Sequence, residues 1–352
     1  MFGRTPQSLL GIDISSSVVK VLELGKKGGK YSVVSYAVEP LPANAVVESK
    51  IENKEDVASA IRRAVKRSGT KAKEAAVAVS ANSAITKIIA YPASLSDREM
   101  EEQILLEAES HIPYPLEEVR LDFEVLGSSE ADPEVVEVLL AASRSENVDL
   151  RTEVLEMAGL KPKLVDVEAY TVENACSLIS SQLPLQGKGL TVAVVDIGAT
   201  VTTLHILVDG KIVFTREQAF GGRMLTENIA QHYGMSTSDA GQAKKENNLP
   251  DDYGPKVLEP FKQLMTTTVT RGLQFFFSTS TQYQSIDHIL LAGGCASIQG
   301  VDAMIEEDTE TTTTIANPFV DMVLNSKVQV SALSNDAPSM LIACGLAMRS
   351  FD

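Results

Sequence analysis

The chain has 352 residues, 44% of them hydrophobic, which is enough for two ordinary domains or one large bilobed unit. Its formal net charge of −16 argues against a general nucleic-acid-binding protein, because such proteins need a basic surface. The three cysteines are far apart and fit buried thiols in a reducing cytosol rather than disulfides or a zinc site. We find no apolar run long enough to span a membrane and no secretory signal at the start, so we expect a cytoplasmic protein.

Two apolar runs, residues 9–14 and 18–24, predict a pair of buried strands joined by a turn. The turn region carries Asp13 and three consecutive serines, polar groups that are costly in a core but suited to a polar ligand. An ordinary exposed turn is the alternative interpretation. The second run continues through a hairpin into a third strand, and the stretch 53–69, which is helical by its spacing and stopped by Gly69, follows.

The stretch from about residue 85 to 164 predicts a compact insert with the element order β-α-β-β-α. Ser96 and Glu99 have the spacing of a capping box in front of its first helix. Gly159 closes its second helix as a C-terminal cap. A strand-then-helix pattern resumes directly after the insert.

The second half of the chain begins by repeating the opening. An apolar strand ends in Asp196-Ile197, a small-residue turn follows, and a second strand leads into an Asp209-Gly210 hairpin. Asp196 lies 183 residues after Asp13, and this separation indicates a duplicated fold rather than a solenoid.

The remaining elements of the second half include a long helix, from about residue 255 to 283, and a strand that ends at Gly293-Gly294. The threonine-rich stretch 306–314 predicts an exposed loop. A helix rich in small residues closes the chain.

Two strand-turn-strand hairpins that face each other across a cleft would direct their turn amides inward and form anion sites. Asp13 and Asp196 can then hold Mg²⁺ through water, and Lys20 can offer a point charge to a phosphate. The missing side chains at Gly293-Gly294 leave room for a base or ribose. Together these features predict a cradle for a nucleoside di- or triphosphate, although each alone is typical of a tight turn, a strand end or a surface lysine.

Three motifs, "DISSSVVK", "DIGATVT" and "LAGGCAS", resemble the phosphate 1, phosphate 2 and adenosine motifs of the superfamily of actin, sugar kinases and heat-shock chaperones. The resemblance implies an α/β, bilobed actin-like fold, which is a duplicated ribonuclease H-like fold. The insert stands where the cell-division protein FtsA carries its extra subdomain. The implied division is 1–84 for the first half of lobe I, 85–164 for the inserted FtsA-like subdomain, 165–190 for the strand and helix that complete lobe I, and 191–352 for lobe II with a C-terminal helix that returns to lobe I.

The stretches "HIPYPLEEV", "ANPF" and "TREQAFGGRMLTENI" resemble the PilM family, actin-like cytoplasmic proteins of the type IV pilus machine. The resemblance implies that ATP binds between the lobes, with at most slow hydrolysis. It also implies that the N-terminal cytoplasmic tail of the inner-membrane protein PilN lies in a groove beside the insert. Other inner-membrane pilus proteins and the assembly ATPases would be indirect partners, and the protein would be peripheral to the inner membrane and support pilus biogenesis and twitching motility. A homo-oligomer is left open.

The same resemblance assigns site residues by position. Those at the metal would be Asp13 and Asp196. Those at the phosphates would be Ser15, Ser16, Ser17 and Lys20 on one side, and Gly198, Ala199, Thr200 and Thr202 on the other. Those at the adenosine would be Gly293, Gly294 and Ser297, with Gly222 and Lys244 reaching the base and ribose. Two positions depart from the family pattern: Ser15 stands where many relatives have glycine, and Gly241 stands where relatives often have a glutamate.

Glu168 is the nearest candidate to orient an attacking water, and a helix N-terminal carboxylate that complements the dipole is its alternative role. Two other functions remain open at this point. A sugar-kinase-like phosphotransferase would need a general base and a polar sugar pocket, for which the sequence offers only Asp166 and Glu168. A filament-forming actin homologue is neither supported nor excluded.

Overall fold

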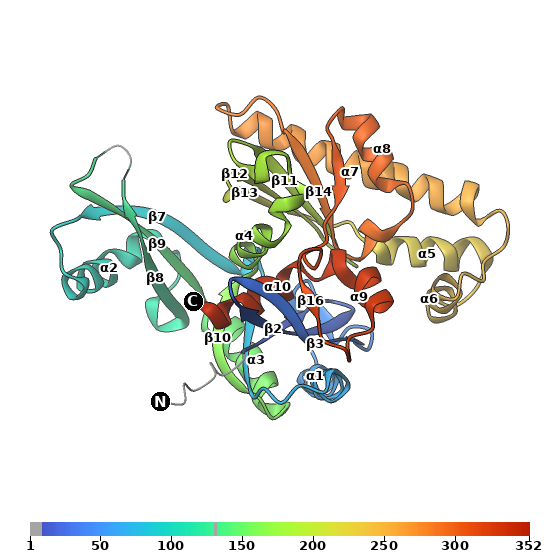
Figure 1. Cartoon of the computed structure of the whole chain (residues 1–352), viewed down its shortest axis with the longest axis horizontal. Coiled ribbons are helices and arrows are strands. Elements are labelled where there is room, and N and C mark those ends of the chain that lie inside the picture. The colour runs from blue at the N-terminus through green and yellow to red at the C-terminus, as the bar shows by residue number, and fades with distance from the viewer. Residues whose placement is uncertain (1–8, 130–131) are drawn as a thin grey trace.

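The computed structural model describes residues 9–129 and 132–352. The start of the chain, on which the expectation of no secretory signal rests, lies outside these residues. Two mixed sheets form the body, and a third, smaller sheet projects from one side (Figure 1). Within the described ranges, no helix is both long and apolar enough to cross a bilayer.

The first sheet has six strands in the order β10-β6-β1-β2-β3-β16. Their bounds are Lys161–Val167 (β10), Glu74–Val79 (β6), Leu9–Ile14 (β1), Val18–Lys27 (β2), Lys30–Pro40 (β3) and Val323–Leu324 (β16). Strands β1, β2 and β3 are joined antiparallel, whereas β6 and β10 continue the sheet in parallel. Helix α1 (Lys54–Ser68) packs on one face, capped by Asn53 and ended by Gly69 in the left-handed conformation as the sequence predicts.

The second sheet repeats this topology with five strands in the order β13-β12-β11-β14-β15. Their bounds are Lys211–Gln218 (β13), Thr202–Val208 (β12), Thr191–Ile197 (β11), His288–Ala292 (β14) and Thr313–Ile315 (β15). The pairings again run antiparallel for β11, β12 and β13 and parallel for β14 and β15. The duplication that the two aspartates indicate is therefore present in the strand order.

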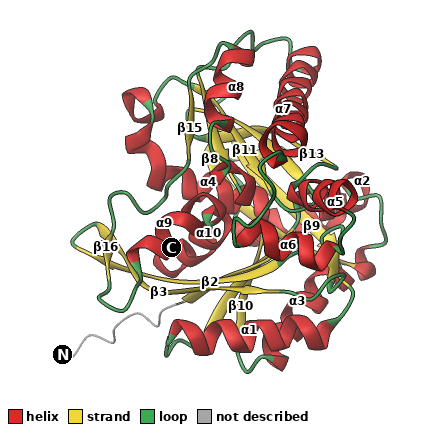
Figure 2. Ribbon diagram, turned by 90° about the vertical axis from the view of Figure 1, so that its right-hand side faces the viewer, coloured by secondary structure: helices red, strands yellow, loops and turns green. Residues whose placement is uncertain are grey.

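Two helices lie between the sheets (Figure 2). Helices α4 (Glu168–Ile179) and α10 (Leu341–Met348) share one apolar core with strands of both sheets. They cross so closely that a Cβ on Gly345 would lie 1.8 Å from the carbonyl oxygen of Thr171, so only glycine fits there. Helix α4 follows the first half of the chain and α10 ends the second half, so the two halves share one core around these helices.

The outer helices of the second half are α5 (Gly222–Tyr233), α6 (Thr237–Lys245), α7 (Glu259–Thr279), α8 (Val301–Thr309) and α9 (Val330–Asp336). The expectation of an exposed loop over 306–314 is wrong. Its first residues belong to α8, and Thr313, which is buried, begins β15 on the edge of the second sheet. β-branched threonines suit a strand, and this preference outweighs their polarity here.

The insert forms its own sheet in the order β7-β9-β8, with bounds Ala84–Pro92 (β7), Val135–Arg144 (β9) and Val119–Ser128 (β8). Helix α2 (Asp97–His111) covers one face, and the predicted capping box of Ser96 and Glu99 is confirmed at its start. Helix α3 (Ser145–Met157) instead places Val154 and Leu155 in the core beneath α1. The domain limits drawn from the sequence stay a prediction.

Candidate functional site

The turns of the two equivalent hairpins touch each other. Thr200, in the turn between β11 and β12, donates a hydrogen bond from its hydroxyl to that of Ser16 over 3.1 Å. Ser16 lies in the turn between β1 and β2, 184 residues away in the sequence. The duplication therefore brings the two predicted phosphate turns to one place between the sheets.

A buried ion pair lies behind the first turn. The Nζ of Lys20 is 2.8 Å from the Oδ2 of Asp13, and the two residues are 8% and 4% exposed. They are direct partners across β1 and β2, which fixes their contact. Burial alone would lower the pKa of Lys20, but the attraction of Asp13, and then of Asp196, raises it above its ordinary value. Lys20 is thus held as a cation between carboxylates from both halves.

Asp196 ends the corresponding strand of the second half. Burial raises the pKa of its carboxyl to about 6, with Lys20 opposing the shift and Asp13 adding to it. Its side chain has no hydrogen-bond or ion-pair partner within residues 9–129 and 132–352. A carboxylate whose ionised form burial disfavours, and that lacks a direct ion-pair partner among the described residues, fits a cation that binds from outside.

Glu168 is the first residue of α4, between the sheets. Burial raises the pKa of its carboxyl to about 8, Asp13 adds to the shift, and Arg151 opposes it. The carboxyl is largely protonated at neutral pH, and its role at an attacking water stays a prediction.

Arg151 is a charged neighbour of Glu168 that the sequence analysis did not single out. It is 4% exposed, and its guanidinium donates to the carbonyl oxygens of Ala78 over 2.5 Å, Ser49 over 3.0 Å and Asn147 over 3.1 Å. These bonds hold α3 against the end of β6 and place a cation near Glu168. The sequence did carry a signal that Arg151 is buried: its helical spacing places it on the same face of α3 as Val154 and Leu155.

Two residues predicted to contact phosphates, Ser15 and Thr202, donate their hydroxyls to backbone carbonyls of the protein instead. Ser15 donates to the carbonyl oxygen of Val18 over 2.9 Å and so closes its own turn. Thr202 is 1% exposed and donates to the carbonyl oxygen of Phe220 over 3.0 Å. Both hydroxyls shape the hairpins, whereas Ser16 and Ser17 stay partly or fully exposed beside the ion pair.

The second turn is also tied to the start of α5. The amide of Gly222 donates to the carbonyl of Gly198 over 3.0 Å, and that of Arg223 donates to the carbonyl of Ala199 over 2.7 Å. A Cβ on Gly222 would lie 2.8 Å from the Sγ of Cys295, so this position admits only glycine without a shift. The turn, the helix start and the third glycine segment therefore form one packed unit.

The third glycine turn lies against the end of β11. Gly293 has a φ of +84°, and a Cβ there would lie 2.5 Å from the Oδ1 of Asp196 and 2.4 Å from the carbonyl oxygen of Ile197. A Cβ on Gly294 would meet nothing within 4 Å. Packing therefore requires glycine at position 293, whereas Gly294 leaves open space near Asp196, the candidate metal ligand. Ser297, one turn on, donates to the carbonyl oxygen of Asn335 over 3.5 Å.

Lys244, on α6, completes the set of sequence-predicted residues. Its Nζ donates to the hydroxyl of Thr226 over 2.7 Å, and burial lowers its pKa, with Cys295 opposing the shift. Cys295 belongs to the glycine turn that starts at Gly293, so Lys244 lies close to that turn.

Among the described residues, no group of three or more histidine, cysteine, aspartate and glutamate side chains is arranged to hold a metal ion. The two aspartates alone suit Mg²⁺, which keeps several waters and is completed by phosphates.

Comparisons with known proteins bear on the family and the fold of the chain. Residues 11–351 match the model of the family described as type IV pilus assembly protein PilM. The chain is similar to a solved structure of a PilM-PilN type IV pilus biogenesis complex, with a TM-score of 0.80 and 26% identity over 99% of this chain and 100% of that one. Its fold is also similar to that of ethanolamine utilization protein EutJ from Carboxydothermus hydrogenoformans, with a TM-score of 0.58 and 14% identity over 98% and 90% of the two chains.

A curated relative, ethanolamine utilization protein EutJ of Salmonella typhimurium, is 28% identical over 154 residues, which are 44% of this chain and 47% of that protein. The match therefore spans about half the length of the curated relatives. The expected α/β actin-like fold is confirmed by the duplicated sheets and the structural likenesses.

Proposed function

This chain belongs to the PilM family of type IV pilus assembly proteins, and from that premise we propose that it is an ATP-binding adaptor of the pilus machine. It binds ATP with Mg²⁺ between its two sheets. It holds the N-terminal tail of a PilN partner beside its insert, and that partner keeps it at the cytoplasmic face of the inner membrane. Membership of this family does not favour the sugar-kinase and filament-forming alternatives.

The observation that carries the nucleotide proposal is the meeting of Asp13, Lys20 and Asp196 between the sheets. The two aspartates would hold Mg²⁺ through water, and Lys20 would offer a point charge to a phosphate. Bound Mg²⁺ would supply the positive charge that neutralises the phosphates. With a pKa of about 6, the carboxyl of Asp196 is mostly ionised at neutral pH and so available to the metal.

The remaining predicted residues divide by role. The backbone and hydroxyls of two serines and of the second turn face the phosphates: Ser16, Ser17, Gly198, Ala199 and Thr200. Those assigned to the nucleoside are Gly222, Lys244, Gly293, Gly294 and Ser297. Ser15 and Thr202 keep the turns in shape. Because the pKa of Glu168 is raised to about 8, the carboxyl is mostly protonated at neutral pH, which favours slow hydrolysis or none.

The partner groove that we favour lies between the insert and the body. A cavity of about 390 Å³ is lined by β7 and β9 of the insert, by the start of α4 and by β13. β7 is an edge strand of its sheet, and Ile88 on it is 62% exposed. An extended tail can pair with such an edge while its side chains enter the cavity. The similar complex of PilM with PilN supports a PilN tail as the occupant.

Calorimetric titration with a synthetic N-terminal tail peptide of the cognate PilN tests the adaptor role. We expect wild type to bind the peptide and Ile88→Glu to lose at least about tenfold in affinity. Leu106→Glu, which changes an 83% exposed leucine on α2, is the matched control and should bind as wild type does. Equal binding by the two variants would place the tail elsewhere, and no binding by wild type would contradict the adaptor role.

A further inference from the structure

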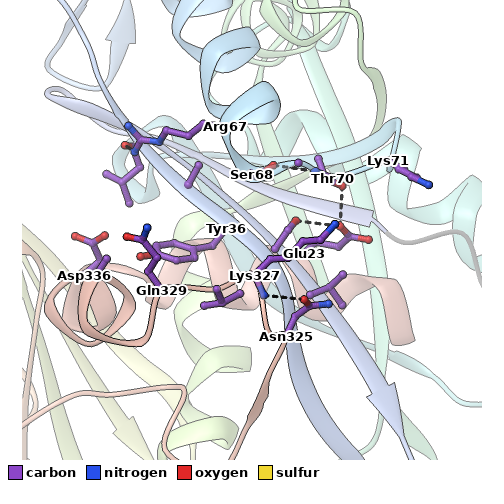
Figure 3. Close-up of a pocket in the computed structure, with 17 residues that line it drawn as sticks. Glu23, Tyr36, Arg67, Ser68, Thr70, Lys71, Asn325, Lys327, Gln329 and Asp336 are labelled. Atoms are coloured by element: carbon purple, nitrogen blue, oxygen red, sulfur yellow. Dashed lines mark hydrogen bonds between the residues drawn. The ribbon is translucent and has the colours of Figure 1, made fainter.

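A second cavity, of about 610 Å³, lies on the opposite edge of the first sheet from the insert. Its walls are β3, the end of α1 and the segment 325–336, which leads into and includes α9 (Figure 3). We refer to it as the edge cavity. None of the residues predicted to hold nucleotide lines it.

The edge cavity runs beside an open strand edge. The short strand β16 pairs with β3 only at Ser32 and Val33, and β3 continues to Pro40. The residues 34–38, beyond that pairing, line the cavity. Within the part of the chain that the structure describes, no strand pairs with this stretch on its outer side. An open edge of this kind is a template for an added strand.

A buried carboxylate forms part of the cavity wall. Glu23 is 7% exposed and accepts hydrogen bonds from the hydroxyls of Ser35 over 3.0 Å and Thr70 over 2.7 Å. Across residues 9–129 and 132–352, no basic side chain forms an ion pair with it. Both hydroxyls bond to Oε2, so Oε1 has no hydrogen-bond partner among the described residues and is not enclosed by the protein. This oxygen is free to accept a hydrogen bond from a cation that enters the cavity.

Other groups around the cavity also favour a cation. Helix α1 ends there at Gly69, and its free carbonyl groups are the negative end of the helix dipole. Asp336 lines the far side, and Figure 3 shows the ring of Tyr36 between it and Glu23. An anion such as a nucleotide would meet two carboxylates and a helix C-terminus, which argues against it.

The basic residues of the lining do not neutralise this wall. Arg67 is bound to the Oε2 of Glu39 over 3.2 Å and to the carbonyl oxygen of Val38. Lys71 and Lys327 are exposed, and Figure 3 shows Lys71 pointing away from Glu23. Lys20 and Arg67 attract the carboxylate of Asp336, whereas Glu23 has no ion-pair partner among the described residues, and the mouth carries two solvated cations.

We propose that the edge cavity binds an extended segment of a protein partner, with its backbone along the open edge of β3 and a basic side chain that reaches Glu23. The strand edge gives the backbone hydrogen bonds, and the buried carboxylate selects the charge. This site is separate from the groove beside the insert, because the two cavities share no lining residue.

The test uses the full chain and an array of nine-residue peptides with a central arginine flanked by valine, threonine and serine in varied order. A matched array carries citrulline, the uncharged analogue, at the centre. The strongest binder is then measured in solution by fluorescence anisotropy. We expect citrulline to weaken its binding at least about tenfold, and Glu23→Gln to do the same.

Two further variants separate the site from general effects. Glu101→Gln removes an equal charge from the exposed face of α2 and should leave the affinity unchanged. Ala332→Phe places a large side chain in the edge cavity while it leaves Glu23 unchanged, and it should abolish binding even if Glu23→Gln folds poorly. The proposal is overturned if arginine and citrulline peptides bind alike, if Glu23→Gln and Glu101→Gln have equal effects, or if Ala332→Phe still binds.

Discussion

The ammonium nitrogen of Lys20 lies 2.8 Å from the Oδ2 of Asp13, and the two residues face each other across adjacent strands. This contact buries both charges at the point where the two halves of the fold meet. In the function proposed above, the same two side chains are the groups that a metal and a phosphate would meet.

Removing one partner of this pair should be more harmful than removing both. Lys20→Met leaves the buried charge of Asp13 uncompensated, at a cost of about 3–5 kcal/mol in the free energy of unfolding. The double variant Asp13→Asn with Lys20→Met should lose clearly less. Urea denaturation of wild type, both single variants and the double variant gives the coupling energy. Lys188→Met, on an exposed lysine, is the control, and a coupling energy near zero would contradict the account.

Glu168 should make the protein less stable as the pH rises. Its pKa in the folded state is about 8, above its ordinary value of 4.5, so the folded state keeps a proton that the unfolded state releases between these values. Stability therefore falls as the pH rises from 4.5 to about 8.

Glu168→Gln should flatten this part of the stability profile, because glutamine does not titrate. Denaturation midpoints across the same pH range for wild type, Glu168→Gln and the exposed control Glu101→Gln provide the measurement. Parallel profiles for all three proteins would show that Glu168 titrates normally.

The two adjacent glycines of the third turn should respond differently to alanine. Gly293→Ala forces a Cβ against Asp196 and Ile197 at a φ of +84° and should cost at least about 2 kcal/mol of stability. Gly294→Ala meets no neighbouring atom and should stay within about 0.5 kcal/mol of wild type. Its Cβ should nevertheless weaken ATP binding, and thermal melts with and without Mg²⁺-ATP separate the two effects. Equal destabilisation by both variants would speak against the packing described here.

The sequence predicted those features that depend on local pattern. The capping box of Ser96 and Glu99 and the end of α1 at Gly69 follow from neighbouring residues, and both are confirmed. The duplication was visible because two strand-turn-strand units carry the same Asp-Ile pair, and the strand orders agree with it.

The features that were missed depend on contacts between distant segments. The direction of the Thr202 hydroxyl depends on Phe220, and the role of Arg151 depends on the carbonyl of Ala78 at the end of another strand. The threonine-rich stretch became a strand only because β14 offers it an edge. The edge cavity exists because residues near 325 meet β3, almost 300 residues earlier, and no local pattern predicts that pairing.

Calorimetric titration of Mg²⁺-ATP into nucleotide-free protein tests the central claim most directly. Asp196→Asn is the informative variant, because this side chain has no hydrogen-bond or ion-pair partner among the described residues, and Asp251→Asn, on an exposed residue, is its matched control. We predict that wild type and Asp251→Asn bind with equal affinity and that Asp196→Asn loses at least about tenfold. Absence of binding by stripped wild-type protein, or equal binding by Asp196→Asn, would contradict the claim that these two halves meet around a metal-bound nucleotide.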